Sequence, residues 1–522
     1  MKRTRPLFVA LMTATFMAPL AFAERAPVLQ QIKVPHDYYF REMYLPRVTT
    51  GPTSPAWSPD GGTLVFVMQG NLWRQALGSD MAVQLTAGAG YDFQPDWSPD
   101  GKRIVFTRYQ DDAMELTVLD VDSGQVTPLT RGDAVNLDGP GSDLVRRFII
   151  DNALHWIREY RLDGLRLDAT HALIDDSPKP LVAELAERAR VAVPWPLTIH
   201  AEDHRNLVTL IEPSARGGWD LDGVWADDFH HVVRRLLAGD AHGYYADFEG
   251  TTEELARTVR QGWLFTGQAT PRTGRGRGTD VSTVPMLRFV VCIQNHDQIG
   301  NRARGDRLHH AVDLAAWRAA STLLLMAPMT PLLFMGQEWA ASTPFQYFTD
   351  VEPDLGRLVT EGRRREFSAF PEFAAPEARE RIPDPQSSDT FDRCRLQWDE
   401  RREGSHAPTL ALYRELLRLR RSHGALGASD ATSGEAAAAS RGAVVVHRAD
   451  GSERFGILVQ LSGHGTAAAI DPVDDGAGPP VVVLSTEDAR FAPEPVPPQI
   501  ERQPGRVVAS FARPGAIIVR FA

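Results

Sequence analysis

The sequence predicts a multidomain protein with two β-propeller-like blades, an incomplete (β/α)8 TIM barrel and a C-terminal β-sandwich. Three observations support this order of domains. A turn sequence recurs after 40 residues within 51–130, strands alternate with helices over 131–424, and short strands separated by Gly- and Ala-rich loops fill 425–522. The chain has 522 residues, which is enough for roughly two to four domains.

The first residues predict a secretory signal. Three basic residues among the first five precede an apolar run over 7–20, and Ala21-Phe22-Ala23 offers a cleavage site. We therefore expect residues 1–23 to be a signal peptide, 24–50 a linker, and the mature protein to be periplasmic or secreted. The alternative is a retained anchor, but the apolar run is too short to span a bilayer stably.

Residues 51–130 carry the repeat. PAWSPDG over 55–61 recurs as PDWSPDG over 95–101. Each Ser-Pro-Asp-Gly favours a tight turn, since Pro fixes φ, Asp caps the turn and Gly accepts positive φ. The strands expected are 63–69, 71–75, 103–109 and 115–120. A 40-residue period of short strands is typical of propeller blades, and this segment resembles the TolB-like repeats of periplasmic proteins. Since about four to eight blades close a propeller, the segment is either a binding platform or a fragment of a larger ring.

From residue 142 the pattern changes to helices alternating with strands. Ser142 can cap a helix that ends before Gly164. The strands expected are 165–168, 197–201, 287–293 and 331–335, and the helices 180–190, 229–237, 252–263, 311–325 and 409–423. Alternation of this kind predicts a parallel sheet, here with about four or five of the eight units of a closed barrel. The change of pattern near 130–132 therefore marks either a natural exported fusion or a joining of two unrelated gene fragments.

Three acidic residues follow predicted strands: Asp168 in DGLRLDATH, Glu202 in LTIHAED and Asp297 in VVCIQNHDQIGN. Barrels of this type assemble their chemistry at the carboxyl ends of the strands. A retaining glycosidase needs a nucleophilic carboxylate and an acid/base carboxyl about 5–5.5 Å apart. Arg166, on the same strand face as Asp168, is suited to keep that carboxylate ionised. Each acidic residue alone is more often a helix cap or ion-pair partner, but together they favour catalysis.

The motifs DGLRLDATH, IHAEDHRN and CIQNHDQIGN resemble three of the four signatures of glycoside hydrolase family 13, the α-amylase family. WADDFHH and TPLLFMGQEWAASTPFQYFTD make the trehalohydrolases the nearest likeness, with glycogen branching enzymes next. The resemblance implies a nucleophile, a general acid/base, a transition-state stabiliser and three sugar-binding or orienting residues. In that order these are Asp168, Glu202 and Asp297, then Arg166, Asn295 and His296. The first family signature, a strand-end Asp followed by Asn-His, is absent.

Further substrate contacts are predicted for His171 and for Asp228 and His230 of WADDFHH. The alternative for WADDFHH is a helix N-cap followed by two surface histidines. The basic stretch RTGRGR over 272–277 is interpreted as a solvated Gly-rich loop.

The composition excludes several other classes of protein. A net charge of −11 argues against non-specific nucleic-acid binding. The two cysteines, Cys292 and Cys394, form neither a disulfide framework nor a zinc motif. No GxSxG, P-loop, HExxH or GxGxxG occurs in context, which excludes serine esterase, NTPase, zincin and dinucleotide-binding interpretations. We expect no metal and no cofactor, and the sequence carries no signal for an oligomeric state.

Two hypotheses from different classes follow. In the first, the chain is a retaining glycosidase that acts on a maltooligosaccharide-type substrate and releases trehalose from maltooligosyl trehalose, or has another activity of the family such as glycogen branching. In the second, the hydrolase part is inactive and the propeller-like part is a periplasmic binding module. The compartment signals conflict, since the leader predicts export whereas the resembled enzymes are cytoplasmic.

Overall fold

The structure is a computed structural model that describes residues 51–521 except 89, 111–112, 131–134, 140, 428–429, 433 and 471–478. The predicted signal peptide, the linker over 24–50 and most of the predicted junction near 130–132 lie outside the described residues. The chain divides into two compact units, Met1–Arg146 and Arg147–Ala522. None of the described helices is both long and apolar enough to cross a membrane.

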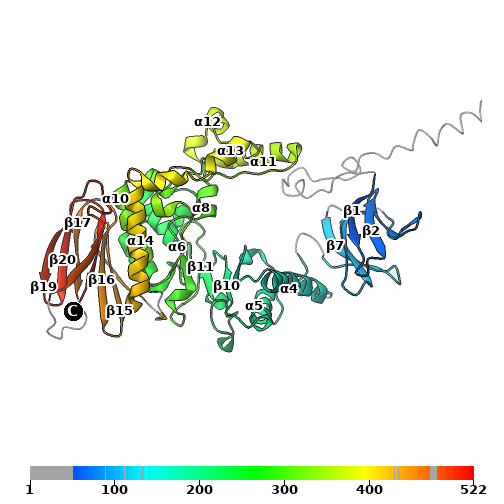
Figure 1. Cartoon of the computed structure of the whole chain (residues 1–522), viewed down its shortest axis with the longest axis horizontal. Helices are drawn as coiled ribbons and strands as arrows, with labels where there is room; N and C mark the ends of the chain where they lie inside the picture. Colours follow the sequence, from blue (N-terminus) through cyan, green and yellow to red (C-terminus); the bar gives the residue numbers. More distant parts are fainter. Residues whose placement is uncertain are drawn as a thin grey trace, which may run out of the picture. The chain divides into compact units, whose positions relative to one another are not determined.

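The first unit contains two four-stranded antiparallel sheets, each paired in chain order (Figure 1). One sheet consists of β1 (Thr53–Trp57), β2 (Thr63–Met68), β3 (Asn71–Ala76) and β4 (Ala82–Gln84). The other consists of β5 (Tyr91–Trp97), β6 (Arg103–Gln110), β7 (Ala113–Asp120) and β8 (Val126–Pro128). The four predicted strands correspond to β2, β3, β6 and β7, whereas the outer strands of both sheets were not predicted.

The sequence repeat is also a repeat of backbone geometry. The pairing of β1 with β2 shifts register between Thr53 and Ala56, and that of β5 with β6 shifts at the equivalent place. Ser54 and Gln94, 40 positions apart, have positive φ values of 49° and 52° at these shifts. The two sheets pack on one apolar core made of Val65, Val67, Leu72, Ile104, Phe106 and Leu119. Each sheet thus buries one face against the other, and membership of a propeller ring stays a prediction.

The two Ser-Pro-Asp-Gly turns make the same hydrogen bonds. Ser58 Oγ donates to Asp60 Oδ1 at 2.6 Å and accepts from the Thr63 N–H at 2.9 Å. Ser98 Oγ donates to Asp100 Oδ1 at 2.6 Å and accepts from the backbone N–H five residues later at 2.9 Å. The turn chemistry predicted from the sequence therefore closes both sheets in the same way.

The second unit is built on a five-stranded parallel sheet of order β13-β12-β11-β10-β9. Its strands are β9 (Gly164–Leu167), β10 (Thr198–Ala201), β11 (Gly223–Trp225), β12 (Phe289–Val291) and β13 (Thr330–Pro331). The predicted parallel sheet with four or five units is present, and β11 is the strand that was not predicted. Among the described residues β9 is an edge strand.

Helices connect the strands in chain order. They are α4 (Ser142–Glu159), which crosses the division between the units, α5 (Leu181–Ala192), α6 (Asp228–Ala238), α7 (Thr252–Gln261), α8 (His296–Gly300), α9 (Leu308–Ala311), α10 (Leu314–Met326), α11 (Pro353–Glu366), α12 (Pro376–Glu380), α13 (Ser388–Cys394) and α14 (His406–Ser422). From Ala315 to Met326 every residue of α10 is buried, as expected of a helix that is apolar on all sides.

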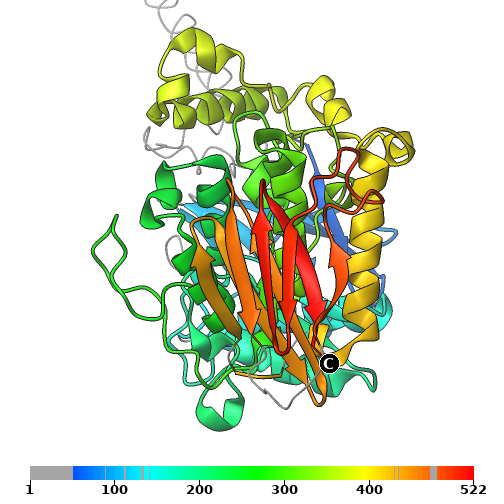
Figure 2. The ribbon, with the colours of Figure 1, turned by 90° about the vertical axis from the view of Figure 1, so that its left-hand side faces the viewer.

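The C-terminal part forms two facing antiparallel sheets, as predicted for a β-sandwich (Figure 2). One sheet contains β14 (Glu435–Ser440), β15 (Ala443–Asp450), β16 (Glu453–Gln460), β21 (Gly515–Arg520) and β18 (Val481–Ser485), and the other β17 (Gly465–Ile470), β20 (Arg506–Phe511) and β19 (Gln499–Gln503). A buried ion pair joins this part to α10, since Arg318 Nη2 donates to Glu487 Oε1 at 2.7 Å. Figure 1 shows α10 and α14 between the sandwich and the parallel sheet.

Candidate active site

The three predicted acidic residues lie at the carboxyl ends of the parallel strands. Asp168 directly follows β9, Glu202 directly follows β10, and Asp297 lies in α8 after β12. Leu167 pairs with Ala201 in the sheet register, so the next residues, Asp168 and Glu202, occupy the same level on neighbouring strands. This is the edge at which barrel enzymes carry their catalytic groups.

Arg166 joins the first two acids. Its Nη1 forms a short ion pair with Asp168 Oδ1, and its Nη2 lies 3.9 Å from Glu202 Oε2. The guanidinium also stacks on the ring of Trp225, 4.2 Å from its centroid. One cation fixed by an aromatic face thus holds two carboxylates in a single charge network.

Asp168 and Glu202 differ in exposure. The side chain of Asp168 is 76% exposed, because it follows the edge strand and has no neighbour on its outer side among the described residues. The side chain of Glu202 is only 15% exposed, and its Oε2 accepts a hydrogen bond from the Ala169 N–H at 2.7 Å. The Glu202 carboxyl is therefore fixed in position, whereas that of Asp168 is held mainly by Arg166.

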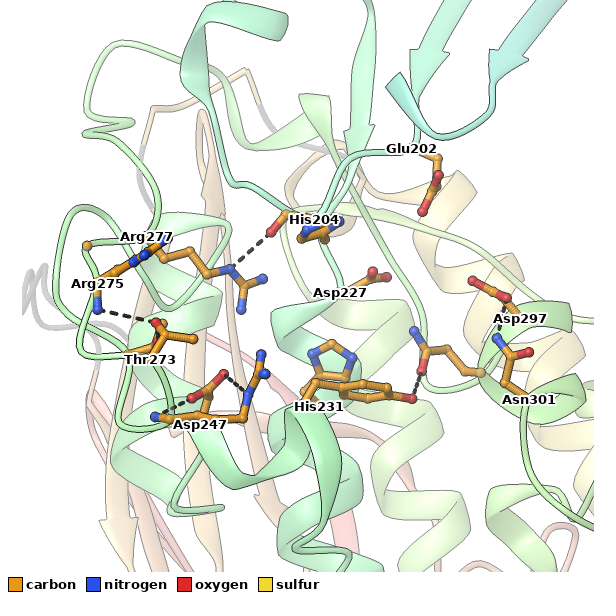
Figure 3. Close-up of a pocket in the computed structure, with 15 residues that line it drawn as sticks. Glu202, His204, Asp227, His231, Asp247, Thr273, Arg275, Arg277, Asp297 and Asn301 are labelled. Atoms are coloured by element: carbon orange, nitrogen blue, oxygen red, sulfur yellow. Dashed lines mark hydrogen bonds and ion pairs between the residues drawn. The ribbon is translucent and has the colours of Figure 1, made fainter. Parts of the chain in front are cut away.

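A pocket of about 420 Å³ opens beside these groups (Figure 3). Its lining residues are Glu202, His204, Asp227, His231, Tyr244, Asp247, Thr270, Arg272, Thr273, Arg275, Gly276, Arg277, Asp297, Gln298 and Asn301. Of the predicted site residues, Glu202 and Asp297 line it. Asp168, Arg166, His171 and His296 do not, and they lie in the segments beside the pocket.

Asp297 is exposed and accepts a hydrogen bond from Asn301 Nδ2 at 2.7 Å. His296 is exposed too, with its ring edge toward Trp225 at 6.0 Å. Asn295, in contrast, is buried, and its side chain caps α8 by accepting from the Gln298 N–H at 2.7 Å. Asn295 therefore caps α8, and its sugar-binding or orienting role stays a prediction.

Asp228 and His230 also point away from the pocket. Asp228 is fully buried and accepts hydrogen bonds from Arg277 Nη2 at 2.8 Å and Asn206 Nδ2 at 2.8 Å. Both ring nitrogens of His230 lie within hydrogen-bond distance of partners, Ile293 O at 3.0 Å and Tyr245 OH at 3.2 Å. Neither residue lines the pocket, because α6 turns both side chains toward the interior, and the substrate contacts predicted for them stay predictions.

Their neighbours Asp227 and His231 face the pocket instead. Burial raises the pKa of Asp227 to about 7, with a further contribution from the nearby carboxylates of Asp228, Glu202 and Asp297. Burial lowers the pKa of His231 to about 3, and Arg277 lowers it further. At neutral pH the pocket thus offers a neutral imidazole and a carboxyl group close to its titration midpoint.

The stretch over 272–277 is an exposed loop, as the sequence interpretation holds, and it also contributes side chains to the pocket. Arg275 and Arg277 line the pocket opposite Glu202 and Asp297 (Figure 3), and Arg272 is also part of the lining. Arg272 Nε donates to Asp247 at 3.3 Å, and Arg277 Nε donates to the His204 carbonyl oxygen at 3.0 Å. Since Arg277 also donates to Asp228, aspartates far away in the sequence hold two of the three arginines, Arg272 and Arg277.

His171 lies in a short 3-10 helix after Asp168. Its ring meets the ring of His204 in an edge-on arrangement, with 4.2 Å between the ring centroids. His204 itself lines the pocket, and burial together with His171 lowers its pKa. His171 therefore supports the pocket wall through His204. Among the described residues, no group of three or more His, Cys, Asp or Glu side chains is placed to hold a metal ion.

The chain is similar in sequence to curated enzymes. The malto-oligosyltrehalose trehalohydrolase of Deinococcus radiodurans is 50% identical over 283 residues, 53% of this chain and 45% of the relative. That of Rhizobium sp. is 46% identical over 299 residues, 56% of this chain and 49% of the relative. The chain thus spans about half the length of the curated relatives it matches. No family model matches the chain.

A solved structure supports the same relationship. The crystal structure of a Salmonella typhimurium protein designated alpha amylase superposes with a TM-score of 0.61 and 32% identity, covering 73% of this chain and 61% of that chain. The motifs that carry the resemblance, around Asp168, Glu202 and Asp297, all lie in the second unit. The chain is therefore related, over about half its length, to the malto-oligosyltrehalose trehalohydrolases and to the α-amylase family of glycoside hydrolases.

Proposed function

We propose that the second unit is a retaining glycoside hydrolase that cleaves the α-1,4-glucosidic bond next to the terminal trehalose unit of maltooligosyl trehalose. Glu202 donates a proton to the glycosidic oxygen while Asp168 attacks the anomeric carbon and forms a covalent glycosyl-enzyme. Glu202 then removes a proton from water, which releases the sugar with retained configuration. Asp297 stabilises the positive charge of the transition state, and Arg166 and His296 orient the sugar.

The position of Arg166 between the two carboxylates carries this proposal. It contacts Asp168 and lies 3.9 Å from Glu202, so two acids from neighbouring strands share one cation. Opposite charge close to a carboxylate favours its ionised form, which a nucleophile requires. A pocket large enough for sugar rings opens on the Glu202 and Asp297 side of this pair.

The test is incubation of the purified full chain with maltooligosyl trehalose, followed by chromatography of the products. We expect release of trehalose, loss of that release in Asp168→Asn, and unchanged release in the control Asp389→Asn, since Asp389 is an exposed residue of α13. Transfer of glucan chains without trehalose release would favour a branching activity. Soluble, folded protein with no turnover would favour a non-catalytic binding role.

For location we propose export, on the basis of the leader over 1–23. Mass spectrometry of the protein from its native host tests this proposal. Cleavage after Ala23 leaves Glu24 as the first residue. An intact Met1 in the mature protein would contradict export through this signal.

A further inference from the structure

Two polar side chains of the pocket, Asp227 and His231, lie one helical turn apart. Asp227 precedes α6 and His231 lies in its first turn, so residues four apart share one face. Both line the pocket. Figure 3 shows them between Glu202 and Asp297 on one side and the loop over 272–277 on the other.

His231 is held rigidly without hydrogen bonds. Only 6% of the residue is exposed, and neither ring nitrogen has a partner among the described residues. Three aromatic rings surround its own ring. The distances between ring centroids are 4.7 Å to Tyr244, 5.4 Å to Tyr245 and 5.1 Å to Phe248. An unsatisfied buried polar group destabilises a protein, so a structural role would favour an apolar residue here.

The contrast with His230 is direct. His230 is equally buried and has a partner for each ring nitrogen. Hence the fold provides partners for the histidine that faces the interior, and none for the histidine that faces the pocket. This difference points to a ligand as the missing partner of His231.

The chemistry of the pair indicates which ligand. A neutral imidazole offers one donor and one acceptor, and a carboxyl group offers acceptors and, when protonated, a donor. Asp227 does not use its carboxyl group to cap α6 by a hydrogen bond. The lining mixes carboxylates with the arginines over 272–277, so charge alone does not select the ligand, and the hydrogen-bonding capacity of the pair does. Adjacent hydroxyl groups of a sugar ring, which donate and accept, match both side chains.

We propose that Asp227 and His231 form a hydroxyl-binding pair that holds one sugar ring in the pocket beside Glu202. The inference rests on the proposed function of the same site and adds the residues that position the sugar. Tyr244, whose hydroxyl donates to Gln298 Oε1 at 3.1 Å, completes the wall against which that ring lies.

The test measures the dissociation constants of maltose and trehalose by calorimetry with the full chain. His231→Leu removes both polar atoms without breaking a hydrogen bond, so we expect about five- to tenfold weaker sugar binding and an unchanged or higher melting temperature. His231→Gln restores a donor and an acceptor, and should recover binding to within about threefold of the natural protein.

His309→Leu is the matched control. His309 is also buried, but its Nε2 lies 2.8 Å from Ala341 O, outside the pocket. We expect it to lower the melting temperature and leave sugar affinity unchanged. Two results overturn the proposed hydroxyl-binding pair. One is equal sugar affinity in His231→Leu and the natural protein, and the other is no sugar binding by the natural protein. Sugar binding that depends on His231 without any trehalose release overturns only the hydrolytic function.

Discussion

Polar side chains in the turns of the first unit have hydrogen-bond partners close by in the sequence, whereas a buried histidine in the pocket of the second unit does not. Ser58 and Asp60 bond to each other and to the backbone of the turn that carries them. In the pocket, neither ring nitrogen of His231 has a hydrogen-bond partner in the described part of the chain, although most of the side chain is buried. Polar groups that are satisfied within a few residues hold the fold, whereas polar groups left unsatisfied in a pocket are available to a ligand.

The largest expected effect is the loss of turnover in Glu202→Gln. The amide removes the proton donor but retains an oxygen that can accept from the Ala169 N–H. We therefore expect kcat for trehalose release to fall by about 10²–10⁴-fold while the melting temperature stays within experimental error. Glu377→Gln, at an exposed position of α12, is the control and should change neither quantity. Equal turnover in both variants would remove Glu202 from the mechanism.

Replacing a buried acid that is paired within the protein should lower stability and leave sugar binding unchanged. Glu487 accepts from Arg318 at 2.7 Å and from Arg513 Nε at 3.1 Å. Glu487→Ala leaves two arginines without their carboxylate, so we expect unfolding free energy to fall by about 3 kcal/mol. Urea unfolding of the full chain measures this change. Sugar affinity should be unchanged in material that is still folded, and weaker binding would contradict the separation between satisfied and available groups.

Asp227, a buried acid that lines the pocket, should make the stability of the protein depend on pH. Its pKa is raised to about 7 in the folded protein from 3.8, chiefly by burial. An acid with a raised folded pKa loses stability as pH rises from its unfolded pKa toward its folded pKa. We expect Asp227→Asn to match the natural protein near pH 4 and to be more stable by about 2 kcal/mol at pH 8. Hydrogen exchange of α6 at both pH values measures this difference, and a constant difference would contradict it.

The positions of the three proposed catalytic acids after parallel strands could be predicted from the sequence, because each follows a β-branched or apolar strand. The register then brings Asp168 and Glu202 to one level, as parallel strands require. In WADDFHH, four of the seven residues are charged or titratable, and only the phase of α6 decides which of them face inward. Asp228 is buried by Asn206 and Arg277, which lie 22 and 49 residues away, so local pattern could not identify it.

Local sequence also predicted only part of the fold. Strands rich in β-branched residues, such as β2 and β6, were predicted to within a few residues. The three-residue strand β11 exists because β10 and β12 pair with it on both sides, and its own sequence is too short to show alternation. Likewise, Arg272 and Arg277 lie in the pocket wall where Asp247 and Asp228 hold them, and both aspartates are distant in the sequence.

The smallest expected effect concerns the repeated turns. Ser58→Ala removes the hydroxyl that donates to Asp60 and accepts from the Thr63 N–H, so we expect β2 to open more easily by about 1 kcal/mol. The equivalent Ser98→Ala should cost less, because Ser98 is less buried than Ser58. Hydrogen exchange of β2 and β6 in the full chain compares the two turns.

The same turn variant carries a pH signature. The Ser58 hydroxyl is the main cause of the lowered pKa of Asp60. An acid with a lowered folded pKa stabilises the fold above its unfolded pKa, and this stability is lost as pH falls toward the folded pKa. Ser58→Ala should therefore weaken the acid dependence of exchange in β2 while leaving sugar affinity unchanged. An unaltered acid dependence would mean that the backbone N–H of Gly62, at 2.9 Å, is sufficient to hold the carboxylate.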